Sequence, residues 1–371
     1  MLPCIRAGFS LFETGTSEMK RILLIKLTSL GDLVHALPAL SDAKSARPEL
    51  EFDWVIDENF QEIARWHPAV KGIVTSNHRQ WREALTYQTT LGSISRLIAG
   101  IRAVEYDLVI DAQGNFKTAL LSMFAKGPRA GFDSHSVREW IAHLAYQRRF
   151  SVPKSAHAIE RLRCLFAAAL DYPVPASQPD FQIQKERFVK PQVDLPREYL
   201  VFVHNASWKT KLWPEAYWVD LLKRSVQAGF KVLLPWGNSQ EEARARRLAI
   251  HSGIQVLPKL SLSEMGYVLE RARACVCMDT GLSHLIAALN VPSITLYGST
   301  DSGLIGASGH SQVHLRSNLD CSPCQKKTCR FSSTENPCLR QITPDRVHRE
   351  LLRQVNPLPA SPGSAPVQAI H

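Results

Sequence analysis

Two acidic residues lie where predicted strands run into helices, and both could take part in chemistry on a bound ligand. Asp32 follows the apolar residues 22–26 and a short polar turn, and a second apolar stretch begins after it. Asp279 directly follows Ala274–Met278 and also precedes an apolar helical stretch. In a parallel α/β sheet such turns lie at the carboxyl ends of the strands, where ligands bind. We therefore expect one binding loop in each half of the chain, with a ligand held between two lobes.

The turn at Asp279 offers groups that suit a phosphate. Thr280 and Gly281 would begin the next helix, whose first backbone N–H groups are unpaired and carry the positive end of the helix dipole. Ser207 and Lys211, in a turn after another predicted strand, add a hydroxyl and an ammonium group. Asp279 would itself repel phosphate, so we expect it to brace the loop or to bind a hydroxyl. A plain helix cap and a solvated lysine remain open as alternatives.

Asp32 could act as a general base. Its carboxylate could take the proton of an attacking hydroxyl group, a role that contributes about 10² to 10⁴ in rate. A cap on the following helix is the alternative. The chain has no D-x-D sequence to hold a divalent ion, and neither G-x-G-x-x-G nor G-x-x-x-x-G-K-[ST]. We therefore predict no divalent-ion requirement, and the sequence does not favour hydride transfer or P-loop ATP hydrolysis.

Length and charge narrow the function classes. A chain of 371 residues exceeds what one hydrophobic core usually organises, so we expect two domains. The net charge of +10 points to anionic partners: nucleic acid, phosphorylated small molecules or an acidic membrane face. No apolar run reaches the roughly 18 residues of a spanning helix, so we expect a soluble or peripheral protein. Nucleic acid is disfavoured because the tryptophans lie in or beside predicted elements, not along a basic stripe.

Alternating strand and helix patterns predict two doubly wound α/β domains with parallel sheets. The predicted strands are residues 22–26, 52–56, 72–75 and 108–110, then 199–204, 231–235, 255–257, 274–278 and 293–297. The predicted helices of the second series are 215–227, 239–252 and 261–271. The predicted organisation is an unstructured extension (1–18), a first domain (19–175), a Pro-rich linker (176–197), a second domain (198–344), a helix (345–356) with packing on the first domain as one option, and a frayed tail (357–371).

Several longer motifs resemble those of a known family. They are K-x-T-S-x-G-D-x-x-H-x-L-P-A-L from residue 26, F-D-W-V from 52, Y-D-x-V-I-D-A-Q-G from 106, L-P-W-G-x-x-x-E-E from 234, V-L-P-K from 256 and D-T-G-L-S-H-x-x-A-A-L from 279. Together they resemble the bacterial lipopolysaccharide heptosyltransferases of glycosyltransferase family 9, and most closely the heptosyltransferase I group.

The resemblance implies a GT-B fold, with two Rossmann-like domains and an interdomain cleft. The implied reaction is inverting, metal-independent transfer of L-glycero-D-manno-heptose from ADP-heptose to the Kdo sugar of a lipid A–Kdo acceptor. The implied location is peripheral, on the cytoplasmic leaflet of the inner membrane, without a nucleic-acid partner. Two alternatives stay open: a heptosyltransferase II-like enzyme that adds a later heptose, and a GT-B nucleotide-sugar epimerase.

The same resemblance assigns roles to individual residues. Asp32 matches the catalytic base, and Lys26, Thr28 and Ser29 match its polar surroundings. Arg79, Arg82 and Arg138 match positions that face the acceptor, although an ordinary solvated loop is the local alternative for the first two. The family tends to have two threonines where this chain has Ala206 and Ser207, so one hydroxyl contact to the donor is missing. The implied donor-binding residues are Ala206, Ser207, Lys211, Glu241, Asp279, Thr280, Gly281 and His284.

Four cysteines form a cluster near the end of the chain. Cys321, Cys324, Cys329 and Cys338 follow the spacing C-x₂-C-x₄-C-x₈-C, which suits a structural zinc site. Free thiols or a labile disulfide are the alternatives. Similar clusters occur in heptosyltransferase II, which leaves the acceptor sugar open. No cofactor is expected to be required for catalysis.

Overall fold

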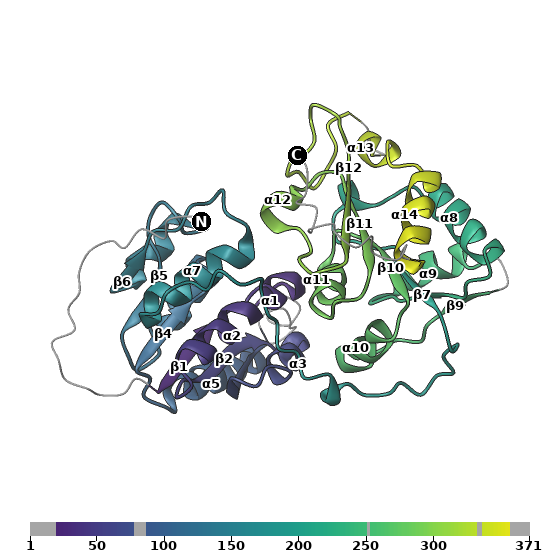
Figure 1. Ribbon diagram of the computed structural model, residues 1–371. Helices are drawn as coiled ribbons and strands as arrows, with labels where there is room; N and C mark the ends of the chain where they lie inside the picture. Colours follow the sequence, from purple (N-terminus) through teal and green to yellow (C-terminus); the bar gives the residue numbers. More distant parts are fainter. Residues whose placement is uncertain (1–19, 78–86, 251–252, 332–335, 357–371) are drawn as a thin grey trace. The chain divides into compact units, whose positions relative to one another are not determined.

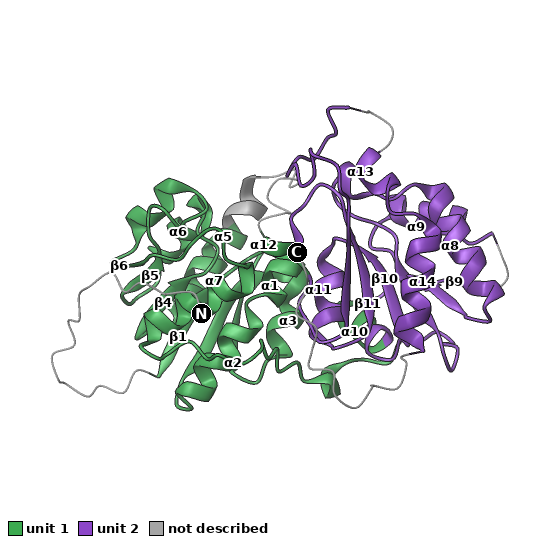
Figure 2. Cartoon of the chain, turned by 45° about the horizontal axis from the view of Figure 1, so that its top comes forward, with its two compact units in different colours: residues 1–190, 261–267, 303–306 green, residues 191–260, 268–302, 307–371 purple. Residues whose placement is uncertain are grey.

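The computed structural model describes residues 20–77, 87–250, 253–331 and 336–356 (Figure 1). The predicted extension at 1–18 and the predicted tail at 357–371 lie outside these residues. The chain divides into two compact units (Figure 2). The first comprises Met1–Lys190, Ser261–Tyr267 and Gly303–Gly306, and the second comprises Pro191–Leu260, Val268–Ser302 and Ala307–His371. The division after Lys190 falls inside the segment 176–197, which the sequence predicts as a linker.

The first unit is built on a six-stranded parallel sheet with the order β3-β2-β1-β4-β5-β6. The central strands β1 and β4 are almost continuous apolar runs, as expected for strands covered on both faces. Their side chains, among them Leu23, Ile25 and Val109, lie in a hydrophobic core. The strands are β1 (Arg21–Ile25), β2 (Glu51–Asp57), β3 (Val70–Ser76), β4 (Leu108–Asp111), β5 (Arg129–Phe132) and β6 (Arg148–Phe150).

The apolar stretch after Asp32 forms two helices, α1 and α2. Pro38 lies in the first turn of α2, where its missing N–H costs nothing, whereas it could not continue α1. Asp32 therefore lies in a helix of only five residues, α1. The helical segments of this unit are α1 (Leu30–Val34), α2 (Leu37–Ala46), η1 (Glu58–Phe60), α3 (Gln61–Arg65), α5 (Tyr87–Arg102), α6 (Phe116–Ser122), η2 (Trp140–Ala145), α7 (Ala158–Leu170) and η3 (Lys185–Arg187).

The second unit repeats this plan with the strand order β12-β11-β10-β7-β8-β9, again parallel throughout. Its core contains Trp213, Trp218 and Met278, all fully buried. The indole N–H of Trp213 donates to the carbonyls of Leu339 (3.1 Å) and Ile342 (2.9 Å), which ties the loop after β7 to the end of the chain. The strands are β7 (Leu200–Val203), β8 (Val232–Leu234), β9 (Ile254–Val256), β10 (Ala274–Met278), β11 (Ser293–Tyr297) and β12 (Gln312–Arg316).

The last described helix, α14, packs in the second unit, against α8, β10 and β11. Val347, Leu351 and Val355 place one apolar face of α14 in the core of that unit. The option that this helix packs on the first domain is therefore corrected. The remaining helical segments are η4 (Lys209–Lys211), α8 (Glu215–Gln227), α9 (Ser239–Leu248), α10 (Leu262–Glu270), α11 (Gly281–Ala288), α12 (Ser302–Ile305), α13 (Pro337–Arg340) and α14 (Pro344–Val355).

Both strand orders are those of a doubly wound α/β fold, so the predicted fold class is confirmed. In each sheet the strand order reverses between the first and the fourth strand along the chain, β1 and β4 in one unit and β7 and β10 in the other. Ligands of such folds bind beside this reversal, at the carboxyl ends of the strands. The loops that follow these four strands are therefore the first place to look for a site.

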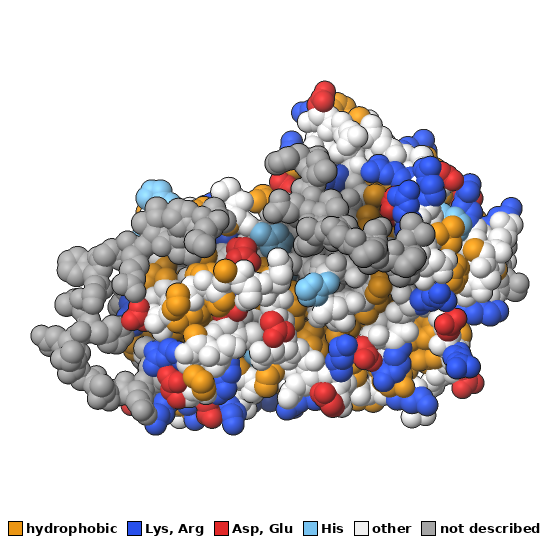
Figure 3. All heavy atoms as spheres, in the orientation of Figure 1, with side chains coloured by type: hydrophobic (Ala, Val, Ile, Leu, Met, Phe, Trp, Pro, Cys, Tyr) orange, Lys and Arg blue, Asp and Glu red, His pale blue; other side chains and the backbone are white. Residues whose placement is uncertain are grey.

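The helices and the surface charge can be compared with two kinds of expected partner, a membrane and nucleic acid. None of the helices in the described part of the chain is long and apolar enough to cross a membrane. On the face drawn in Figure 3, Lys and Arg side chains are interspersed with Asp and Glu. The described residues visible on that face therefore form no continuous basic stripe of the kind that binds nucleic acid.

Candidate functional site

The loops after β1 and β4 are joined by hydrogen bonds. Lys26 follows β1 directly, and its ammonium group donates to the carbonyl of Ala112, in the loop after β4, at 3.0 Å. In return, Gln113 Oε1 accepts from the backbone N–H groups of Leu27 at 2.7 Å and Thr28 at 3.3 Å. These bonds fix the path of the chain between β1 and α1. They therefore fix the start of the helix that carries Asp32.

Asp32 caps its own helix with one carboxylate oxygen. Ser29 precedes α1, and both its backbone N–H (2.9 Å) and its hydroxyl (2.8 Å) donate to Asp32 Oδ2. The other carboxylate oxygen of Asp32, Oδ1, accepts no hydrogen bond from the described residues. The half-buried carboxylate can therefore accept a further proton donor, such as a ligand hydroxyl, without releasing the cap. The two sequence interpretations of Asp32, cap and base, do not exclude each other.

The charges around Asp32 keep it ionised. Burial raises the pKa of Asp32, but the Lys26 ammonium, the two hydrogen bonds from Ser29 and the charge of Arg138 outweigh it and hold the pKa below its ordinary value. Burial lowers the pKa of Lys26, which is 6% exposed, while the charges of Asp32 and Asp111 raise it. A buried charge persists when an opposite charge lies close. Lys26 and Asp32 therefore stabilise each other's ionised forms.

A second carboxylate, Asp111, shapes the loop after β4. It is fully buried and accepts hydrogen bonds from the Tyr146 hydroxyl (2.6 Å) and from the backbone N–H groups of Gln113 (2.9 Å) and Gly114 (3.0 Å). Burial raises the pKa of Asp111 despite these bonds. Its oxygens are engaged by the protein, so it supports the loop geometry and is a poorer candidate than Asp32 for contact with a ligand.

Only one of the three predicted acceptor arginines can be placed. Arg138 is exposed, just before η2, and its charge lowers the pKa of both Asp32 and Lys26, so it lies within electrostatic reach of the cluster. Arg79 and Arg82 lie outside the described residues.

The central loops of the second sheet carry a buried ion pair. Lys211, in the loop after β7, lies 2.7 Å from Asp279 Oδ2 in the loop after β10; their side chains are 13% and 2% exposed. The hydroxyl of Thr300, after β11, donates to the same carboxylate. Lys211 also lies over the ring of Trp208, 4.8 Å from its centre. Asp279 therefore braces three loops at once, which is one of the two roles that we expected for it. An ammonium group has three donors, so Lys211 can also bind an anion.

The start of the helix after Asp279 offers groups that could bind a phosphate. Thr280 caps α11 and exchanges hydrogen bonds with Ser283, whose hydroxyl donates to the Thr280 carbonyl at 2.7 Å. The first N–H groups of a helix, here from Gly281 onward, lack partners within the helix and favour an anion. His284 is buried one turn into α11, with its imidazole 3.8 Å from the Asp279 carboxylate.

The other predicted donor-binding residues lie in neighbouring loops. Glu241 accepts from the backbone N–H of Gly237 at 2.8 Å and lies in the first turn of α9, after β8. Ala206 packs against the core of the second unit, and Ser207 is exposed in the loop after β7. The predicted donor residues thus come from the loops after β7, β8 and β10, which are neighbouring strands in the order β10-β7-β8.

Sequence reasoning missed two residues that hold these sites in shape. Gln113 binds the loop of Lys26, and Thr300 binds Asp279. Each follows a strand that neighbours the strand of its partner, β4 beside β1 and β11 beside β10. The signal for both was a polar side chain at the end of a predicted strand, but the partner could be chosen only once the strand order was known.

Similar proteins identify the family of the chain. The family model for glycosyltransferase family 9 (heptosyltransferase) matches residues 94–334. Lipopolysaccharide heptosyltransferase 1 of Pseudomonas aeruginosa is 46% identical over 347 residues, which cover 89% of this chain and 97% of that protein. The chain belongs to glycosyltransferase family 9.

Two solved structures of one heptosyltransferase are similar to this chain in fold. E. coli heptosyltransferase WaaC with ADP has a TM-score of 0.80 and 38% identity, and the match covers 90% of this chain and 99% of that one. The same enzyme with ADP-2-deoxy-2-fluoro heptose has a TM-score of 0.77 and 37% identity, with the same coverage. The predicted enzyme class, a glycosyltransferase of lipopolysaccharide biosynthesis with the GT-B fold, is thereby confirmed.

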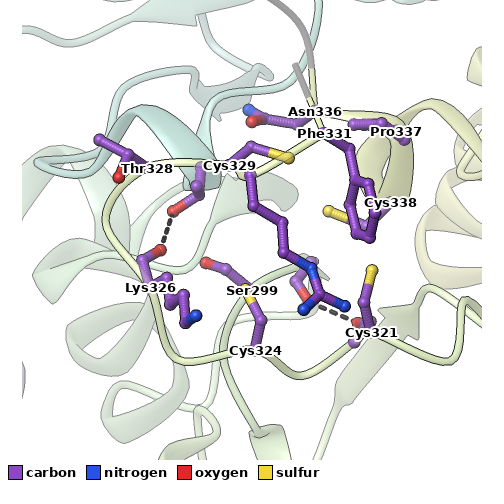
Figure 4. A pocket seen from close by; sticks show the side chains of 14 residues that line it. Ser299, Cys321, Cys324, Lys326, Thr328, Cys329, Phe331, Asn336, Pro337 and Cys338 are labelled. Carbon is purple, nitrogen blue, oxygen red and sulfur yellow. Dashed lines mark hydrogen bonds between the residues drawn. The ribbon is translucent and has the colours of Figure 1, made fainter. Parts of the chain in front are cut away.

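The four clustered cysteines of this family 9 enzyme line one pocket of the second unit (Figure 4). All four are free thiols of intermediate exposure. Burial raises the pKa of the Cys338 thiol, and the nearby Cys324 and Cys321 add to the rise. Within the described residues, no group of three or more His, Cys, Asp and Glu side chains has the arrangement of a metal site. The structural zinc site at Cys321, Cys324, Cys329 and Cys338 stays a prediction.

Metal analysis of the reduced full chain tests that prediction. Binding by four thiolates predicts about one zinc per chain, and its loss in Cys324→Ser, because structural zinc takes four protein ligands. The matched control is Cys277→Ser, which changes a buried thiol outside the cluster. Protein that contains neither zinc nor iron after purification under reducing conditions would remove the metal interpretation.

Proposed function

We propose that the chain transfers L-glycero-D-manno-heptose from ADP-heptose to the Kdo sugar of a lipid A–Kdo acceptor, with inversion and without a metal ion. The main support is the similarity, over most of the chain, to lipopolysaccharide heptosyltransferase 1. The solved relative with ADP-2-deoxy-2-fluoro heptose supports the choice of donor. The charge pattern of the two sets of loops supports the division of labour between them, with the donor on the second unit and the acceptor on the first.

The second unit supplies the groups that a nucleotide diphosphate needs. The start of α11 offers backbone N–H groups and the positive end of a helix dipole, and Lys211 adds an ammonium. Both stabilise the negative charge that grows on the diphosphate as the sugar leaves, each by about 1 kcal/mol or more in a water-poor site. Glu241 is suited to ribose hydroxyls, because its second oxygen remains when Gly237 binds the first.

The first unit supplies the base. As the Kdo hydroxyl attacks the anomeric carbon, the new C–O bond forms and the bond from that carbon to the diphosphate oxygen breaks, with its electron pair leaving on ADP. The hydroxyl proton passes to Asp32, whose ionised form is favoured by Lys26. Because its pKa is low, Asp32 takes the proton only as the hydroxyl becomes acidic in the transition state. A single displacement of this kind inverts the anomeric centre.

The acceptor carries carboxylates and phosphates, which suit the basic charge of the chain. Arg138 is the described arginine best placed to bind them, because its charge reaches the Asp32 cluster. The planar guanidinium group can bind a carboxylate through two parallel hydrogen bonds. Arg79 and Arg82 remain sequence-based candidates for the same role. Because lipid A is anchored in a bilayer, we propose that the enzyme works as a peripheral protein on the cytoplasmic leaflet of the inner membrane.

The two alternatives differ from this proposal in the acceptor. A heptosyltransferase II-like enzyme would need an acceptor that already bears a heptose, and an epimerase would need none. We choose Kdo as the acceptor sugar because the relative that is 46% identical is named lipopolysaccharide heptosyltransferase 1.

Replacing Asp32 tests the base. We expect Asp32→Asn to lower kcat by about 10² to 10⁴ with ADP affinity unchanged, because the amide keeps the shape of the cap but takes up no proton. ADP release from ADP-heptose with a Kdo–lipid A acceptor, measured with EDTA present, gives kcat. Calorimetric titration gives the affinity for ADP.

Glu264→Gln is the matched control for that variant. Ser261 donates its N–H (2.8 Å) and its hydroxyl (2.9 Å) to Glu264 Oε2, the same cap that Ser29 makes with Asp32. The control should cost about 1 kcal/mol of stability at most and keep normal turnover. Near-normal turnover in Asp32→Asn would show that Asp32 is not the base.

Replacing Lys26 tests how Asp32 is kept ionised. Asp32 has a depressed pKa, so its active carboxylate is present at neutral pH and is lost only as the pH falls through that pKa. In Lys26→Met, burial is no longer opposed by the ammonium, so the acid limb of the kcat/KM profile should move to higher pH. Lys71→Met, which removes an exposed lysine paired with Glu51, should leave the limb in place. An unmoved limb in Lys26→Met would contradict this account.

Replacing Lys211 tests the donor site. Lys211→Met should raise the Kd for ADP about tenfold to a hundredfold, because a charge-assisted bond to the diphosphate is lost. It should also destabilise the fold by about 3–5 kcal/mol, because Asp279 stays buried without its partner. Adding Asp279→Asn should restore much of the stability but not the ADP affinity. Lys209→Met, an exposed neighbour, is the control. If the double variant regains ADP affinity, Lys211 acts only through the fold.

A further inference from the structure

Large apolar side chains gather on one part of the first unit. In the described residues nine such residues are exposed, and six of them lie on α6, directly after it at Met123, or on η2, with 44% to 63% of each residue accessible. α6 packs against η2, so the six residues lie on or next to two elements that are in contact. Contiguous exposed apolar surface on a folded domain marks a binding face. We call these residues the apolar patch: Phe116, Leu120, Met123, Trp140, Ile141 and Leu144.

Two of the three large apolar side chains of α6, Phe116 and Leu120, are exposed instead of facing the core. Thr118 and Ser122 are fully buried and Ala119 nearly so, and the two hydroxyls are satisfied by hydrogen bonds within α6 and its cap. Phe116 and Leu120 of α6 and Met123 directly after it are spaced four and three apart, so they share the opposite face. A surface helix normally turns its apolar face to the core. In α6, Leu121 packs against the core, but Thr118, Ala119 and Ser122 fill the rest of that face, and the other large apolar side chains are exposed.

The patch is held in place by the loops around it. The backbone N–H of Phe116 donates to Glu139 Oε2 at 2.8 Å, which joins the start of α6 to the residue before η2. The Arg129 side chain donates to the carbonyl of Ala145 at 2.8 Å, which fixes the other end of η2 to β5. The backbone that carries the patch is therefore ordered before a partner binds, so binding does not have to supply the free energy of ordering it.

The segment of the chain that carries the patch is basic. Residues 116–154, which contain α6, η2, β5 and β6, hold seven Lys and Arg against two Asp and Glu, a net charge of +5. Figure 2 shows α6 at the end of the first unit that carries β5 and β6. The basic residues of this segment are Lys117, Lys126, Arg129, Arg138, Arg148, Arg149 and Lys154.

We infer that the apolar patch docks the enzyme on an anionic lipid bilayer. Apolar side chains that enter the headgroup region, together with basic residues that attract anionic lipid, are the two signals that stable peripheral binding needs. Trp140 strengthens the choice of a membrane, because an amphipathic ring suits the interface. The inference deepens the proposed function and rests on it in one respect, which is that the acceptor is a lipid.

The patch is linked to the candidate base through one short segment. α6 begins shortly after Gln113, whose side chain holds the loop that leads to Asp32. The patch therefore lies in the same unit as the loops that would receive the acceptor sugar, and docking through it would hold that unit at the membrane that carries the acceptor.

Vesicle sedimentation with the full chain tests the inference directly. The probes are vesicles of phosphatidylethanolamine with phosphatidylglycerol, and vesicles of phosphatidylcholine alone. We expect binding to the anionic vesicles that weakens at high salt, and a loss of about tenfold or more in Trp140→Ser/Leu144→Ser. Val189→Ser/Ile250→Ser removes equally exposed apolar side chains outside the patch and should bind as the parent does. Unchanged binding in the patch variant would overturn the inference.

Transfer assays separate this inference from the proposed function. The patch variant should lose transfer to Kdo–lipid A in vesicles but keep transfer to a deacylated, water-soluble Kdo acceptor. If the parent transfers to neither acceptor, the proposed function fails, while vesicle binding still decides the inference. If instead the parent is a dimer in solution and the patch variant a monomer, with neither binding vesicles, the patch is an interface between two copies and the membrane inference is overturned.

Discussion

The structure depends on one constraint, the reversal of strand order at the centre of each parallel sheet. At the carboxyl ends of β1 and β4, and again of β7 and β10, the loops of two neighbouring strands lead to opposite faces of the sheet. This leaves a crevice in which a ligand can bind. Each reversal is bridged by a charged side chain close to the first strand of the unit. Lys26 binds the loop after β4, and Lys211 binds Asp279 in the loop after β10.

Buried charge connects this constraint to chemistry. A charge withdrawn from water is retained only when it is paired and hydrogen-bonded. In the first unit the buried ammonium of Lys26 is matched by Asp32, and the same match keeps Asp32 in the form that accepts a proton. In the second unit the pairing is tighter, because Asp279 is bound by both Lys211 and Thr300, and the start of α11 is fixed beside it. The first unit thus presents a base, and the second presents groups for an anion.

Much of the fold follows from sequence patterns, because apolar runs mark buried strands directly. Ala274–Met278, Ser293–Tyr297 and Glu215–Gln227 have the bounds that the patterns predict. β5, β6 and β12 were missed, because each has few apolar residues and so gives little apolar signal, and β6 and β12 lie at sheet edges. In β5, Gly131 leaves room for the ring of Tyr146. The motifs pointed to the candidate residues, but the pairing of Lys211 with Asp279 depends on β7 lying beside β10, which no local pattern reveals.

The most direct test of the account is a product analysis with a panel of acceptors. ADP and glycosylated lipid would be quantified together, by mass spectrometry, after the enzyme meets ADP-heptose with Kdo–lipid A, with heptosyl-Kdo–lipid A, or with no acceptor. The account predicts one heptose added to Kdo–lipid A for each ADP formed, and little ADP without that acceptor. Equal consumption of the donor in the absence of acceptor, or transfer only to the acceptor that already bears heptose, would contradict it.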